Sequence, residues 1–139
     1  MSHAHHSHQH LATGFGADRA PHYDAQASLN LAGVEAMYEL AVSAMAAQLE
    51  GQTAASLLFV GLGTGAELVP YKRFGVPGWR FTGVEPSEPM LAFARQRLEA
   101  EQLLSRTHLH QGEISTLAPG APFDGAQLMG VLHHVEGNE

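Results

Sequence analysis

The chain has 139 residues, of which 45% are hydrophobic and 15% charged, so it is long enough for one domain with its own core. Its formal net charge of −7 disfavours broad binding to nucleic-acid phosphates, and the absence of cysteine excludes disulfides and thiolate zinc sites. No apolar run reaches the roughly 20 residues of a membrane helix, and no apolar signal segment begins the chain. We therefore expect a cytoplasmic protein that binds neither membranes nor nucleic acid.

The first 22 residues are polar and low in complexity. Imidazoles crowd their first half, at His3, His5, His6, His8 and His10. Such a tract can bind a divalent metal, but it is also typical of a flexible tail or of a purification tag. We predict a flexible tail over residues 1–22, assign no metal site, and take residues 23–139 as the folded domain.

A helix is predicted over residues 30–50. Apolar residues recur there at spacings of three and four, which gives one apolar stripe. Asn30 is the predicted N-cap and Gly51 the predicted stop.

Strands and helices alternate after this helix. Helices are predicted over residues 66–73 and 87–104; Ser87 caps the second, which buries Leu91, Ala94 and Leu98. The predicted strands span residues 56–60, 80–85, 106–111 and 127–132. This alternation predicts an α/β fold, a Rossmann-like doubly wound parallel sheet with strand order 3-2-1-4 and an N-terminal helix.

A glycine-rich loop follows the first predicted strand and reads Gly61-Leu62-Gly63-Thr64-Gly65. The first glycine allows a tight turn, and the second lets a ligand lie against bare backbone. Glu85 ends the next strand, 22 residues after Gly63, where a carboxylate can accept hydrogen bonds from both hydroxyls of a ribose. Because Gly61, Gly63 and Ala66 also fit the dinucleotide fingerprint, NAD is an alternative ligand at this point.

Four segments together resemble the class I S-adenosylmethionine-dependent methyltransferases, and the upstream Tyr23 segment is similar to their small-molecule branch. The segments are residues 59–65 (FVGLGTG), 84–91 (VEPSEPML), 111–114 (QGEI) and 123–135 (FDGAQLMGVLHHV). The resemblance covers residues 20 to 139. It implies S-adenosyl-L-methionine as cofactor and a small molecule as methyl acceptor.

The resemblance also implies the residues that contact the cofactor. Gly61, Gly63 and Gly65 would hold the methionine part, Glu85 the ribose, and Glu113 the adenine amino group, with Ile114 against the ring. Leu62, Thr64 and Pro86 lie within the same motifs and complete the predicted binding set.

Four other residues can each be interpreted in two ways. Met90 and Tyr23 are either packing residues or neighbours of the cofactor. His133 and His134 either position other groups or act as general bases. Asp124 is predicted to fix the entry to the fourth strand. No catalytic residue is assigned.

One position departs from the family. An acid usually stands two residues before the first glycine and helps to bind the amino group of the cofactor, but here the residue is Phe59. The family's sheet has about seven strands, so the resemblance implies a domain truncated after the fourth strand. The open apolar edge of that strand, at Leu128 and the residues after it, predicts a homodimer or a fragment of a longer protein.

The sequence leaves three functions open. The chain supplies the cofactor-binding half of a small-molecule methyltransferase, or it is an NAD-binding oxidoreductase module, or it is a non-catalytic nucleoside-binding remnant.

Overall fold

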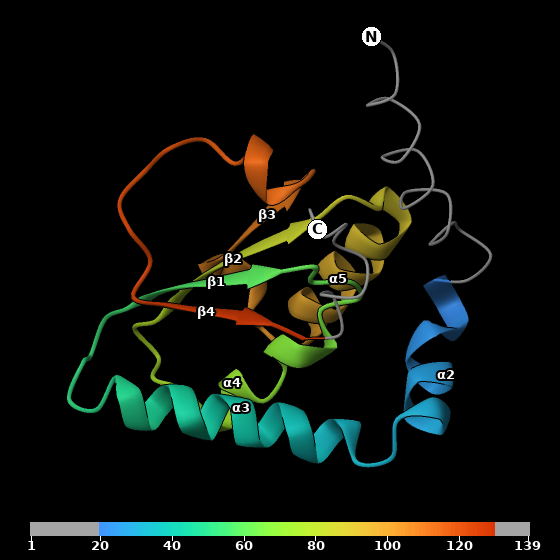
Figure 1. Cartoon of the computed structure of the whole chain (residues 1–139), viewed down its shortest axis with the longest axis horizontal. Helices are drawn as coiled ribbons and strands as arrows, with labels where there is room; N and C mark the ends of the chain where they lie inside the picture. Colours follow the sequence, from blue (N-terminus) through green and yellow to red (C-terminus); the bar gives the residue numbers. More distant parts are fainter. Residues whose placement is uncertain (1–19, 130–139) are drawn as a thin grey trace, which may run out of the picture.

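The computed structural model describes residues 20–129, so the histidine tract, His133 and His134 lie outside the described residues. Four parallel strands form one sheet in the order β3-β2-β1-β4 (Figure 1). They are β1 (Ser56–Val60), β2 (Arg80–Glu85), β3 (Thr107–Gln111) and β4 (Gly125–Leu128). The predicted Rossmann-like sheet and its strand order are confirmed.

The fourth strand begins two residues earlier than predicted. Asp124 explains this, because its Oδ2 accepts a hydrogen bond from the Ser56 backbone N–H at 2.7 Å and its own N–H donates to the Ser56 carbonyl at 2.8 Å. Asp124 therefore holds the entry to β4 against the first residue of β1, and strand pairing begins one residue later, at Leu57 and Gly125. The predicted role of Asp124 is confirmed. Residues 130–132 of the predicted strand lie outside the described residues.

The N-terminal region contains two helices where one was predicted. A short 3₁₀ turn, η1 (Ala20–His22), leads into α2 (Tyr23–Asn30), and α3 (Val34–Gln48) follows. The prediction that Asn30 is an N-cap was wrong, since Asn30 ends α2 and α3 starts after Gly33. Gly33 has a φ of +80°, a conformation that glycine adopts readily and that breaks the helical path.

The helix predicted over residues 66–73 is divided at Pro70. A 3₁₀ turn, η2 (Ala66–Leu68), precedes α4 (Tyr71–Phe74), and Pro70 is the N-cap of α4. Proline has no backbone N–H, so it cannot continue the hydrogen bonding of η2, whereas its carbonyl accepts from Phe74 N–H at 2.9 Å.

For the helix predicted over residues 87–104, the N-cap and the buried face are confirmed, but the predicted C-terminal end is wrong. In α5 (Glu88–Ala100), the Ser87 hydroxyl accepts from the Met90 N–H, and Leu91, Ala94 and Leu98 are buried. The helix ends four residues before the predicted position because Gln102 has a φ of +60°. Two further 3₁₀ turns, η3 (Leu104–Arg106) and η4 (Ile114–Thr116), flank β3.

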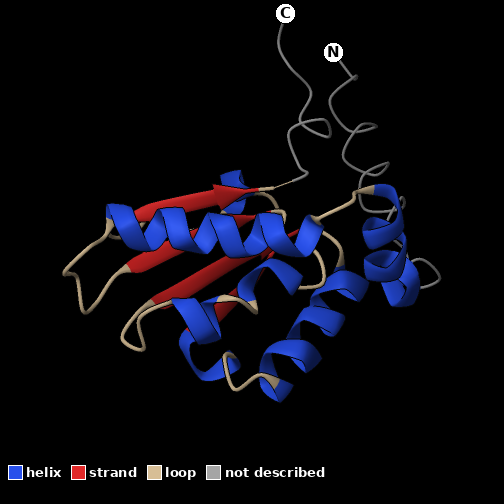
Figure 2. Ribbon diagram, turned by 90° about the horizontal axis from the view of Figure 1, so that it is seen from below, coloured by secondary structure: helices blue, strands red, loops and turns tan. Residues whose placement is uncertain are grey.

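Helices α3, α4 and α5 pack on one face of the sheet (Figure 2). Phe59 lies on that face, fully buried, and makes edge-to-face contacts with Tyr71 of α4 and with Phe81 of β2. On the other face Val84 is buried, and the remaining side chains are partly or fully exposed at Leu58, Val60, Thr82, His108, His110, Ala126 and Leu128. The core therefore lies between the sheet and one helical layer.

Candidate functional site

The glycine loop leaves β1 at the carboxyl edge of the sheet and is fastened to β2. The N–H groups of Gly61 and Leu62 both donate to the Val84 carbonyl, at 2.8 and 3.0 Å. Gly61, Gly63 and Gly65 all have positive φ values, between +57° and +75°. A loop with three such residues needs glycine, because side chains are unfavourable in this conformation.

Gly63 and Gly65 have different surroundings. A Cβ on Gly63 would meet no atom of the described chain closer than Met90 Cε at 3.8 Å, so the space above this backbone is open to a ligand. A Cβ on Gly65 would lie 3.3 Å from Ala94 Cβ, so Gly65 allows α5 to pack closely against the loop. Met90 itself is buried, which favours its interpretation as a packing residue.

Leu62 and Thr64 turn their side chains into the protein. Leu62 packs over Gly83 of β2, where an added Cβ would come within 2.4 Å of Leu62 Cδ2. The Thr64 hydroxyl donates to Asp24 Oδ1 at 2.6 Å and accepts from Arg97 Nη1 at 2.7 Å. From these two residues, the backbone rather than the side chain is available to a ligand.

Asp24 and Arg97 join the N-terminal region to the glycine loop. Arg97 of α5 forms an ion pair with Asp24 of α2 and donates to the Thr64 carbonyl at 2.8 Å. Sequence reasoning missed this network, because the ion pair joins residues 73 positions apart and nothing in the Tyr23 segment, which includes Asp24, indicates Arg97 as a partner.

Glu85 ends β2 and is connected to the glycine loop. Its Oε2 accepts from Gly63 N–H and its Oε1 from Ser87 N–H, both at 2.9 Å, and only 7% of the residue is exposed. Burial raises the pKa of the Glu85 carboxyl, and the two N–H donors oppose that effect in part. A carboxylate has about four acceptor positions, so two hydroxyl groups can still bind.

Pro86 follows Glu85 at the end of β2, and Glu113 and Ile114 follow the neighbouring strand β3. Gly112 N–H donates to the Glu85 carbonyl at 3.1 Å, which brings the segment after β3 beside the end of β2. Glu113 is half-buried, and Ile114 is 47% exposed, so an apolar surface is available there. The structure thus brings all the predicted binding residues to one edge of the sheet.

A second buried carboxyl, Glu67, was not predicted to belong to the site. It lies in η2 and is 4% exposed, and its Oε2 accepts from Gln127 Nε2 of β4 at 2.7 Å. Its Oε1 is buried and accepts no hydrogen bond within residues 20–129. Burial raises the pKa of Glu67 to about 8, although the Gln127 hydrogen bond lowers it somewhat.

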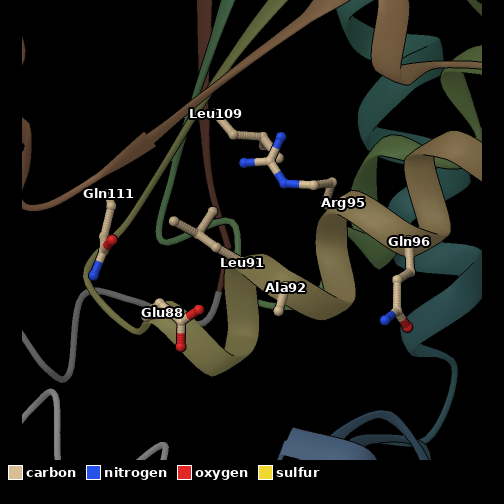
Figure 3. Close-up of a pocket in the computed structure, with 7 residues that line it drawn as sticks. All are labelled: Glu88, Leu91, Ala92, Arg95, Gln96, Leu109 and Gln111. Carbon is tan, nitrogen blue, oxygen red and sulfur yellow. The ribbon is translucent and has the colours of Figure 1, made fainter.

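A groove of about 310 Å³ lies between α5 and the edge strand β3, and none of its lining residues belongs to the glycine loop (Figure 3). Its lining consists of Glu88, Leu91, Ala92, Arg95, Gln96, Leu109 and Gln111. The charged and amide side chains among these residues are all exposed, so the groove has no buried polar group that would select a ligand.

A sequence profile for a family described as a methyltransferase domain matches residues 57–139 of this chain. The chain belongs to this methyltransferase-domain family. The match begins in β1 and includes the glycine loop, Glu85 and Glu113. A comparison with curated protein sequences gave no match.

Solved structures of methyltransferases share the fold. A candidate S-adenosyl-L-methionine-dependent methyltransferase from Methanococcus maripaludis has a TM-score of 0.70 at 19% identity, over 88% of this chain and 53% of its own. A methyltransferase from Thiobacillus denitrificans, in complex with S-adenosyl-L-homocysteine, has a TM-score of 0.54 at 21% identity. The match covers 70% of this chain and 38% of that protein. The glycopeptide N-methyltransferase MtfA with sinefungin has a TM-score of 0.51 at 25% identity, and the match covers 65% of this chain and 35% of that protein. The chain therefore spans about half the length of the first of these proteins.

Proposed function

We infer that this chain binds S-adenosyl-L-methionine at the carboxyl ends of β1 and β2 and supplies the cofactor-binding part of a methyltransferase. The observation that carries the proposal is the Glu85 carboxylate, which is buried and held beside the glycine loop by the N–H of Gly63. The residues fit this cofactor, because open space lies above Gly63 and the carboxylate retains acceptor positions for a ribose. The family match favours this cofactor over the NAD that the glycine pattern also allowed.

Each predicted residue has a role in this proposal. The backbone of Gly61–Gly65 lies along the methionine part, and Glu85 accepts from the ribose hydroxyls. Pro86 and Ile114 pack near the adenine, and Glu113 accepts from its amino group.

S-adenosyl-L-methionine supplies a methyl group that is already activated on a sulfonium, so the protein contributes mainly position and the exclusion of water. Leu62 and Thr64 contribute to position here, because their buried side chains fix the course of the loop backbone. The residues that bind the acceptor are not among those assigned.

The acceptor is proposed to be a small molecule. The net charge of −7 offers no broad cationic surface for nucleic-acid phosphates, and one protein of the same fold is a glycopeptide N-methyltransferase. None of the described helices is long and apolar enough to cross a membrane. A cytoplasmic location and a homodimer through the open edge of β4 stay predictions.

The test is calorimetric titration of the chain with S-adenosyl-L-homocysteine and, separately, with NAD. We expect saturable binding of the former alone. Glu85→Ala should weaken this binding by roughly 30- to 150-fold, since hydrogen bonds to charged groups contribute about 2–3 kcal/mol. Glu99→Ala, which removes an exposed carboxylate from α5, is the control and should leave affinity unchanged. Equal affinity in the wild type and Glu85→Ala would disprove the assignment of the ribose to Glu85.

A further inference from the structure

The buried carboxyl of Glu67 lies where the order of the sheet reverses. From β1 the chain passes to β2 on one side, whereas β4 pairs with β1 on the other side. Glu67 follows the loop after β1, and its partner Gln127 lies on β4, one residue before the end of that strand. In open α/β sheets, ligands bind in the crevice at such a reversal point. Glu67 thus lies at this reversal point, directly after the glycine loop.

One oxygen of Glu67 is fixed and the other is unsatisfied. The Tyr71 hydroxyl donates to Gln127 Oε1 at 3.1 Å, which turns the Gln127 amide N–H₂ toward Glu67 Oε2. Oε1 is buried and accepts no hydrogen bond from the described residues. Leaving a buried acceptor unpaired is unfavourable, and for a carboxylate the most favourable partner is a cationic donor. The arrangement is therefore suited to a ligand that brings an ammonium group.

The other site residues indicate which end of the ligand reaches Glu67. Along the carboxyl edge of the sheet, Glu113 follows β3, Glu85 ends β2, the glycine loop follows β1, and Glu67 contacts β4. A ligand with its adenine at β3 and its ribose at β2 directs its amino-acid end toward β1 and β4. That end of S-adenosyl-L-methionine bears the ammonium group.

Phe59 leaves this end of the site without a carboxylate from β1. Its ring is fully buried against Tyr71, and Phe59 is the register partner of Gln127. Neighbouring residues in register point to the same face of a sheet, so Glu67 reaches the face on which Phe59 lies. We propose that Glu67 Oε1 binds the ammonium group of the cofactor, and so supplies from η2 the carboxylate that Phe59 cannot supply from β1. This proposal rests on the proposed function.

Protonation links the proposal to a measurable quantity. With a pKa of about 8, the Glu67 carboxyl is mostly protonated at neutral pH before the ligand binds. An ammonium group on Oε1 would lower this pKa, so binding would release a proton near pH 7 and would strengthen as the pH rises toward 8.

Two tyrosines near Glu67 have pKa values that are raised further from neutral pH. Burial raises the pKa of Tyr38 on α3 to about 12, and it also raises that of Tyr71 on α4. Tyr23 and Asp24 of α2 lie near Tyr38, as does Arg97 of α5, and Asp24 and Arg97 neutralise each other in their ion pair. Neither tyrosine therefore competes with Glu67, whose pKa of about 8 lies close to neutral pH.

The experiment compares two ligands on the full chain by calorimetry. S-adenosyl-L-homocysteine carries the ammonium group, whereas 5′-methylthioadenosine retains the adenosine and lacks the amino-acid end. Glu67→Gln should weaken the binding of S-adenosyl-L-homocysteine by about tenfold or more and leave the affinity for 5′-methylthioadenosine unchanged. Titrations in buffers of different ionisation enthalpy should show close to one proton released by the wild type and a smaller release by Glu67→Gln. Glu99→Gln is the matched control, since it makes the same change on an exposed residue of α5.

The outcomes separate the two proposals. If the wild type binds both ligands and Glu67→Gln binds S-adenosyl-L-homocysteine with unchanged affinity, the assignment of Glu67 is wrong while the proposed function stands. If Glu67→Gln weakens the binding of both ligands equally, Glu67 has a structural role, and the assignment of Glu67 to the ammonium group is also wrong. A wild type that binds neither ligand would disprove the proposed function, and this inference with it. Thermal unfolding of each variant verifies that the fold is intact.

Discussion

At the scale of single residues, the glycines of the loop have separable purposes. Gly63 has a φ of +57° with open space around it, whereas Gly65 has a φ of +75° and lies against Ala94. The first position concerns a ligand, and the second concerns packing between the loop and α5.

Gly63→Val and Gly65→Val should therefore fail differently. Gly63→Val should abolish binding of S-adenosyl-L-homocysteine and keep the far-UV helix signal near that of the wild type. Its free energy of unfolding should fall by about 1–2 kcal/mol, because valine is unfavourable in the left-handed conformation. Gly65→Val should lose stability as well, by about 1–3 kcal/mol more, because its side chain meets α5. Urea unfolding and calorimetry measure the two effects. Retained binding by Gly63→Val would mean that the loop is only a turn.

Glu67 should also make stability depend on pH. Its pKa is raised from 4.5 to about 8 on folding, so the folded state binds more protons than the unfolded state between these values, and stability falls as the pH rises through that window. Glu67→Gln should remove this loss and raise the free energy of unfolding near pH 8 by about 2–4 kcal/mol. Urea unfolding of both proteins at about pH 5 and about pH 8 is the measurement. Parallel curves for the two proteins would contradict the burial of an ionisable group there.

A variant that is more stable but binds its cofactor less well would indicate that the carboxyl is present for function. Buried groups that lower stability are typical of binding sites. The stability measurement is independent of the cofactor, so it tests the buried environment of Glu67 even if the ligand is different.

At the scale of elements, the network of Asp24, Thr64 and Arg97 connects α2, the glycine loop and α5. The three groups are linked by charge-assisted hydrogen bonds, which are stronger than neutral ones. Because the ion pair is about one third exposed, water screens part of its energy. The position of α2 beside the loop therefore depends on these partly screened polar contacts, since no residue of α2 whose burial is described is buried.

Arg97→Ala should release α2 from the loop. We expect faster hydrogen exchange in residues 23–30 and a loss of stability of about 1–2 kcal/mol. Arg95→Ala, two residues away on the same helix and exposed, is the matched control and should change neither quantity. Unchanged exchange in Arg97→Ala would show that α2 is held by other contacts.

At the scale of the whole molecule, the described helices cover one face of the sheet, and on the other face most side chains are partly or fully exposed, whereas Val84 is buried. Within the described residues β4 pairs with β1 alone, so its outer edge has no partner strand there, and Leu128 is 45% exposed. An unpaired edge next to apolar side chains favours association with another strand.

We predict that the purified chain forms a dimer through this region. Light scattering should give twice the monomer mass at micromolar concentration, and Leu128→Lys should shift the protein toward monomer, since a charged side chain at an edge opposes pairing. Leu40→Lys, on the exposed side of α3, is the control for added charge. A wild type that is monomeric at all concentrations would exclude the predicted dimer.

The sequence by itself determined the sheet, the glycine loop and the position of Glu85. These features depend on local patterns: short apolar runs, glycines where a side chain is unfavourable, and an acid at the end of a strand. Helix boundaries were less well determined, because the breaks at Gly33, Pro70 and Gln102 depend on backbone conformations that compete with the apolar pattern.

Only the tertiary structure decided the surroundings of Glu67, Asp24 and Arg97. In sequence, Glu67 is an ordinary acid after a glycine loop; its burial results from contact with Gln127, 60 positions away. The Asp24–Arg97 ion pair likewise joins residues 73 positions apart. Burial and pairing set the energy of a charged group, and both are properties of the packed chain, so no local pattern of residues could specify them.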